Sequence, residues 1–163
     1  MATGTILLPL TAAVIDPTIQ GPARSNDARG RRFYLFDQTT DEVLLWVLSV
    51  PVDFASALTI FAQVSFPAAT TGVYRLRSQV MCAADGVDVD TASFDTLEDN
   101  GSDVTVPGTA GLIDTVSYAP SNTDSIAASS YMAIQIGREN AVVGTNAAED
   151  MQMWNAWLEY TTT

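Results

Sequence analysis

The 163 residues carry nineteen acids against seven bases, all arginine, for a net charge of −12, and they include no histidine and one cysteine, Cys82. A charge of this sign repels nucleic acid and anionic membrane surfaces, so we expect neither as a partner. Without histidine there is no Ser-His-Asp or Cys-His site, and no dinucleotide or P-loop fingerprint occurs. We therefore expect a protein that is not an enzyme, binds no cofactor and holds no zinc.

The first 32 residues differ from the rest in composition. Proline and glycine recur in them, and four arginines face two acids, a net charge of +2, whereas residues 33–163 carry three arginines and seventeen acids, −14. We predict an extended N-terminal arm over 1–32 and one domain over 33–163. A solvated tail is the alternative, but the many apolar side chains favour an arm that docks on an acidic neighbour. The expected contact residues are Arg24, Arg29, Arg31, Arg32, Leu7, Leu8 and Leu10.

Residues 33–163 read as strands separated by turns. Alternating or continuous apolar residues predict strands at 33–36, 42–50, 58–66, 73–83, 112–119, 131–138 and 151–160. The segment 42–50 is apolar on both of its faces, so we expect something to cover the outer face as well. Strands that each bury one face imply two packed sheets. The predicted fold is an all-β antiparallel sandwich, a jelly roll of about eight strands. An immunoglobulin-like sandwich is the runner-up, without the cysteine pair that marks many of its members.

An acidic loop is expected between residues 85 and 106. Asp85, Asp88 and Asp90 could supply three oxygen ligands to calcium, although the spacing does not fit an EF-hand loop. A solvated loop on an acidic protein is the simpler interpretation, and we predict no metal site.

Three side chains on the predicted strands, Arg75, Arg77 and Trp157, are candidates for a subunit interface. Arg75 and Arg77 share the strand face opposite the core. They pair either across a subunit contact or within one sheet, and the sequence does not choose between the two. Trp154 and Trp157 are three residues apart, so in a regular strand they face opposite sides. The pattern places Trp154 on the core face, with Ala156, and leaves Trp157 for the outer face or an interface.

Several segments of the domain resemble a group of small virion proteins of tailed bacteriophages. The resemblance rests on FDQTTDEVLLWVLSVPVDFASALTIFAQVSF, DGVDVDTASFD, VPGTAGLIDTVSYAPSNTDSIAASSYMAIQIGR and a terminal WLEYTT, and it covers roughly residues 33–163. It implies a jelly-roll head decoration (cement) protein, or a related tail-fibre or spike module. Decoration proteins of this kind are commonly trimers on the outer surface of the head.

This resemblance favours a structural role in the virion. Its expected partners are the major capsid protein and two further copies of the chain, with the arm clamping neighbouring capsid subunits. The alternative is a receptor- or glycan-binding module of a phage tail fibre or spike. A carbohydrate-binding module of an enzyme is the third reading, and it is less favoured because the chain starts at Met1 without a linker-like tail.

Overall fold

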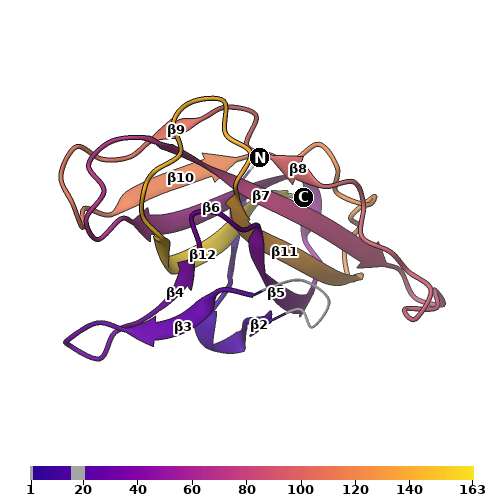
Figure 1. Cartoon of the computed structure of the whole chain (residues 1–163). Helices are drawn as coiled ribbons and strands as arrows, with labels where there is room; N and C mark the ends of the chain where they lie inside the picture. The colour runs from indigo at the N-terminus through magenta and orange to yellow at the C-terminus, as the bar shows by residue number, and fades with distance from the viewer. Residues whose placement is uncertain (1, 16–20) are drawn as a thin grey trace.

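Two antiparallel sheets pack face to face in the structure, a computed structural model that describes residues 2–15 and 21–163 (Figure 1). One six-stranded sheet, here the β6–β12 sheet, runs in the order β10-β6-β12-β4-β3, with β1 also paired to β12. The other, the β7–β11 sheet, runs β2-β5-β11-β7-β8, with β9 also paired to β7. The predicted antiparallel β-sandwich is confirmed. The strands are β1 (Thr3–Leu7), β2 (Val14–Ile15), β3 (Ala23–Asn26), β4 (Arg32–Phe36), β5 (Glu42–Ser49), β6 (Phe54–Ser65), β7 (Val73–Ala83), β8 (Glu98–Asp99), β9 (Val104–Thr105), β10 (Asp114–Tyr118), β11 (Tyr131–Glu139) and β12 (Met151–Thr162).

All seven strands expected from the apolar pattern are present. The largest difference is at β6, which begins at Phe54, four residues before the predicted start. Helical structure in the described residues is a single 3-10 turn, Leu10–Ala12, and none of their helices is long and apolar enough to cross a membrane.

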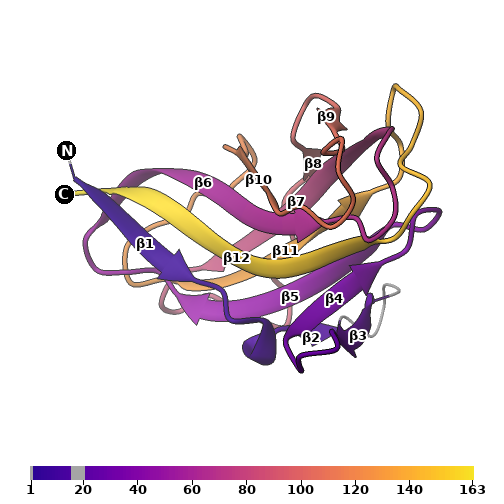
Figure 2. The ribbon, with the colours of Figure 1, turned by 90° about the vertical axis from the view of Figure 1, so that its left-hand side faces the viewer.

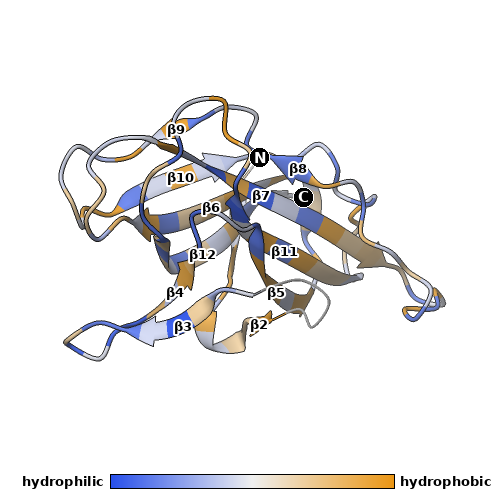
Figure 3. Cartoon of the chain, viewed as in Figure 1, coloured by the Kyte–Doolittle hydropathy of each residue, from blue (hydrophilic) through white to orange (hydrophobic). Residues whose placement is uncertain are grey.

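The core lies between the two sheets, and β6 and β7 contribute to it by alternation. In residues 58–64 of β6 and 74–80 of β7 every second residue is buried, among them Ile60, Val64 and Leu76. Figure 3 shows the resulting hydrophilic and hydrophobic bands on β7. Strand β5 contributes Leu44 and Trp46 to this core, but the expected cover on its other face is incomplete, because Val47 is 54% exposed. The prediction that both faces of this strand are covered was therefore only partly right.

The N-terminal residues are not a separate arm, which corrects the predicted boundary at 32/33. Strand β1 pairs with β12, β2 pairs with β5, and β3 forms a hairpin with β4. Leu8 is only 1% exposed and belongs to the core, and Trp46 donates its indole N–H to the carbonyl of Pro9 over 3.0 Å. The apolar side chains that suggested docking on a partner are used in the chain's own sandwich. Met1 and residues 16–20 of the predicted arm lie outside the described residues.

Candidate functional site

Aromatic side chains gather on the outer face of the β6–β12 sheet, away from the core. Phe61 of β6 and Trp157 of β12 are cross-strand neighbours whose rings stack, with centroids 5.0 Å apart and planes 6° from parallel. Phe33 of β4, which is only 6% exposed, and half-buried Trp154 of β12 form a second pair with ring centroids 4.8 Å apart. The three strands that carry these rings are neighbours in the sheet, with β12 between β6 and β4. Aromatic rings at a surface offer large apolar area of fixed shape, which is the usual foundation of a binding site.

Both tryptophans lie on this face because β12 contains a bulge. Its register against β6 shifts between Met153 and Asn155, where one extra residue is inserted opposite the partner strand. Trp154 therefore packs outside, with its indole N–H donated to the hydroxyl of Ser65 over 2.7 Å. The expectation that Trp154 shares the core face with Ala156 was wrong, since it assumed a regular strand. Trp157 lies on the outer face, as expected.

A second irregularity lies in the same sheet, near the C-terminal end of β12, and a hollow is found beside it. The register of β12 against β6 shifts again after Tyr160, and the extra residue on β6, Ala57, has a φ of 51°. A non-glycine residue in this left-handed region costs free energy, and such residues cluster at functional sites. The resulting hollow has a volume of about 150 Å³ and is lined by Thr3, Ala57, Thr59, Glu159, Tyr160 and Thr161.

The hollow and the stacked rings form one continuous surface. Glu159 lines the hollow, and its carboxylate accepts the indole N–H of Trp157 over 3.2 Å, which holds the ring in place. Thr59 and Thr161 line the same hollow and bring hydroxyl groups to it. An apolar platform next to hydrogen-bonding oxygens suits a ligand that has both an apolar face and several hydroxyl groups.

The four arginines of the predicted contact set lie on one exposed hairpin. Arg24 belongs to β3, Arg32 begins β4, and Arg29 and Arg31 lie in the turn between them; all four are exposed. The hairpin projects from the sandwich, and its tip is strongly hydrophilic (Figures 1 and 3). The guanidinium carbon of Arg31 lies over the Trp154 ring, 5.5 Å from its centroid. The hairpin therefore continues the aromatic face.

The three leucines expected beside these arginines do not form one surface. Leu7 is 70% exposed, Leu8 is a core residue, and Leu10 is partly buried against the core. Of the three, only Leu7 is open to a partner, and it lies opposite Trp157 in the β1–β12 ladder.

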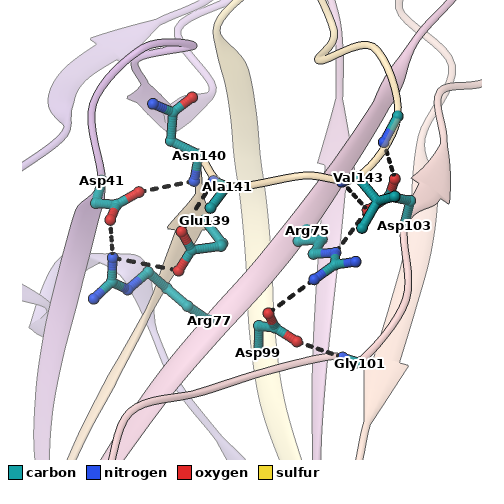
Figure 4. A network of polar contacts seen from close by, with 11 residues as sticks. Asp41, Arg75, Arg77, Asp99, Gly101, Asp103, Glu139, Asn140, Ala141 and Val143 are labelled. Carbon is teal, nitrogen blue, oxygen red and sulfur yellow. Dashed lines mark hydrogen bonds and ion pairs between the residues drawn. The ribbon is translucent and has the colours of Figure 1, made fainter.

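Arg75 and Arg77 pair within the chain, which is one of the two readings that the sequence left open (Figure 4). Arg75 bonds Asp99 over 3.0 Å and Asp103 over 2.6 Å, and Arg77 pairs with Asp41 and Glu139. Both side chains are nearly shielded, 13% and 11% exposed. They hold loops onto the β7–β11 sheet, and the carboxylates that pair with them come from distant parts of the sequence.

The acidic loop forms turns of its own. The carboxylate of Asp88 accepts the N–H of Asp90 over 3.0 Å, and Asp85 is exposed. Within residues 2–15 and 21–163, no three acidic, histidine or cysteine side chains are arranged to hold a metal ion.

Phe61, Phe33 and Glu159 were not among the site residues expected from the sequence. One signal was available: Phe61 stands between Thr59 and Gln63 on the face that alternation assigns to solvent. A large aromatic residue on the solvent face of a strand indicates a surface that binds a ligand or a partner.

Comparisons with known proteins show the fold. No protein-family model and no curated protein matches the chain. Among solved structures, the xylan-binding module CBM15 aligns with a TM-score of 0.51 and 11% identity, covering 99% of each chain. The C-terminal CBM6 of LamC, a marine laminarinase from Zobellia galactanivorans, gives 0.49 and 11%, covering 97% of this chain and all of that one. A chain of infectious bursal disease virus, Gx strain, gives 0.42 and 11%, covering 97% of this chain and 31% of that one. The likeness to CBM15 confirms the jelly-roll β-sandwich.

Proposed function

We propose that this chain is a non-catalytic module that binds glycans on the outer face of the β6–β12 sheet. The observation that carries the proposal is the stacked pair Phe61 and Trp157 beside the hollow that contains Glu159. A pyranose ring has an apolar face of C–H groups, which packs on an aromatic ring, and a rim of hydroxyls, which bonds to carboxylate and threonine oxygens.

The geometry of β12 favours an extended ligand over a single sugar. Trp154 and Trp157 are three residues apart on one strand, so their backbones are separated by about 10 Å at the usual rise per residue. The hollow lies further along the same strand, beyond Trp157. A chain of several linked sugars would cover all three places at once. The name of CBM15 states that it binds xylan, so this sandwich fold has room for a polysaccharide ligand.

The experiment is a titration of the purified chain with soluble xylan, laminarin and hydroxyethylcellulose, followed by calorimetry. We expect binding to at least one of them, and a loss of at least about tenfold in affinity for Trp157→Ala, because one buried tryptophan often dominates such a contact.

The matched control is Val47→Ala. Val47 is also an exposed apolar residue on the outer face of a sheet, but it belongs to the β7–β11 sheet. The Val47→Ala variant should bind the same polysaccharide with the affinity of the parent chain. If Trp157→Ala folds and binds every tested polysaccharide with unchanged affinity, the glycan would have to be held elsewhere and the proposal would fail.

A second candidate is attachment to the outer surface of a phage head, which the resemblance of residues 33–163 to virion proteins suggests. The exposed arginines of the β3–β4 hairpin favour it, because they would face an acidic capsid protein. A density map of a purified particle would show the position of the chain directly, and finding it on the tail would favour receptor binding over decoration.

A further inference from the structure

The exposed positive charge of this protein is concentrated at one end of the aromatic face. The sequence has no lysine or histidine, and outside the β3–β4 hairpin the arginines are Arg75, Arg77 and Arg138. The first two are shielded from solvent, 13% and 11% exposed, and Arg138 is fully buried. In the described part of the chain, the arginines open to solvent are therefore those of the hairpin, Ala23–Phe36.

Arg31 is held in a fixed position on this hairpin. Its Nε and Nη2 both bond Oδ2 of Asp27, each over 2.6 Å, while Oδ1 of Asp27 accepts the backbone N–H groups of Arg29 and Arg31. The guanidinium then lies over Trp154. Its Nη1 has no protein partner among the described residues, and the side chain is 64% exposed.

The strand register separates the arginines by face. Phe33, which contacts Trp154, points to the outer side of β4, and Tyr34 points to the core. Arg24 is the cross-strand partner of Tyr34, so its side chain leaves the hairpin on the side opposite to Phe33. Arg31 is thus on the aromatic side, and Arg24 is on the other.

We infer that the glycan bound by the aromatic face is anionic, a polysaccharide with carboxylate or sulfate groups. Arg31 takes one of these groups at the Trp154 end of the face, and Arg29 stands next to it in the turn. A planar guanidinium suits both anions, because it donates parallel N–H bonds to two oxygens. This inference rests on the proposed function and adds the chemical class of the ligand.

The net charge of −12 does not prevent such binding. Exposed charges are screened beyond about 8 Å at physiological salt, and the hairpin projects from the acidic body (Figure 1). An anion at its tip therefore responds mainly to the charges of the hairpin itself, which are four arginines and Asp27. An acidic protein surface would be attracted by the same charges, but it would not use the sugar platform that Arg31 borders.

The test compares polygalacturonate with the same polymer fully methyl-esterified, and dextran sulfate with dextran. Each pair shares a backbone and differs in charge, and the two pairs distinguish carboxylate from sulfate. We expect the anionic member of at least one pair to bind at least tenfold more tightly to the intact chain. This preference should weaken as salt is raised from 50 to 500 mM.

The decisive variant is Arg31→Gln, with Arg24→Gln as its matched control, since both remove one charge from the same hairpin. Arg31→Gln should lose about tenfold in affinity for the preferred anionic polymer, and its affinity for the neutral polymer should not change. The affinity of Arg24→Gln for the anionic polymer should stay within twofold of the parent. Arg31→Lys, which keeps the charge but not the planar fork, should fall between them. Circular dichroism and thermal melts check that each variant is folded.

Three results would overturn the inference. Equal losses for Arg31→Gln and Arg24→Gln would mean unspecific attraction. Equal affinity for charged and neutral polymers, with sensitivity to Trp157→Ala, would leave glycan binding in place but remove the anionic ligand. Loss of binding by Arg31→Gln to purified acidic capsids alone, with polysaccharide binding unchanged, would assign the hairpin to a protein partner.

Discussion

Arg138 is the most deeply buried charge of the sandwich. Its guanidinium donates to the carbonyls of Glu149, over 2.7 Å, and Ala147, over 3.1 Å, and to the side-chain oxygen of Asn146, over 2.9 Å. It also lies 5.6 Å from the centre of the Phe66 ring. Burial lowers the pKa of Arg138, and nearby carboxylates oppose that shift. This one side chain ties the segment before β12 to strand β11.

Replacing Arg138 by methionine should destabilise the protein strongly. The variant leaves one buried and two part-buried acceptors without donors, and we expect a loss of about 3 kcal/mol in the free energy of unfolding. Urea titration measures it. Arg24→Met is the control, since Arg24 is exposed and its loss should stay within about 0.5 kcal/mol. Equal urea midpoints for the two variants would show that the hydrogen bonds of Arg138 do not stabilise the fold.

The ladder between β6 and β12 shows what could be predicted at the scale of an element and what could not. Alternating or continuous apolar residues predicted seven strands, all of which are present, and the buried face of β6, because a regular strand of a sandwich must bury one face. A bulge adds one residue without a compositional mark, so the pattern placed Trp154 on the wrong face. The bulge at Ala57 was equally invisible, and with it the hollow beside Glu159.

Ion pairs between distant loops were the second feature beyond the reach of the sequence. Asp103 joins Arg75 on β7 to the backbone N–H groups of Val143 and Gly144 (Figure 4). These partners are 28, 40 and 41 residues away, and no local pattern links them. Burial alone would raise the pKa of Asp103, but these hydrogen bonds and the charge of Arg75 lower it below 3.8.

Asp103→Asn should therefore weaken the protein in a pH-dependent way. The folded state holds the carboxylate with a lowered pKa, so its contribution is present above the ordinary value of 3.8 and is lost as pH falls through the folded pKa. The gap in unfolding free energy between parent and variant should be constant near neutrality and shrink below about pH 4. Denaturant titrations at several pH values measure this gap. Asp85→Asn, on the exposed turn, is the control, and a gap that grew with acidity would contradict the assignment.

At the scale of the whole molecule, the N-terminal residues complete the sandwich. The sequence identified their apolar character, but it could not show that their partners are strands β12 and β5 of the same chain. The paired residues are about 30 positions apart for β2 and β5 and at least 150 apart for β1 and β12, so both pairings depend on tertiary packing. The arm was predicted from composition alone. Edge strands of a sandwich can have the same apolar, proline- and glycine-containing composition.

Two neighbouring leucines test this assignment. Leu8→Ala removes a core side chain and should cost about 2–4 kcal/mol of unfolding free energy, whereas Leu7→Ala, at a 70% exposed position, should cost less than about 0.5 kcal/mol. Chemical denaturation of both variants gives the comparison. Similar small losses would restore the picture of an arm that is independent of the core.

The pairing of β1 with β12 has a consequence for how the module can be joined to other chains. The backbone N–H of Thr162 donates to the carbonyl of Ala2 over 3.0 Å, so the two ends of the sandwich meet at one point (Figure 2). A domain with this geometry can be spliced into a surface turn of a host protein, where entry and exit need only the width of two strands. The same closeness allows circular permutation: a short linker could join the ends while a new break is opened in the exposed turn at residues 84–91. The aromatic face would keep its structure, and the position of the new ends would set how this face is oriented relative to a host protein.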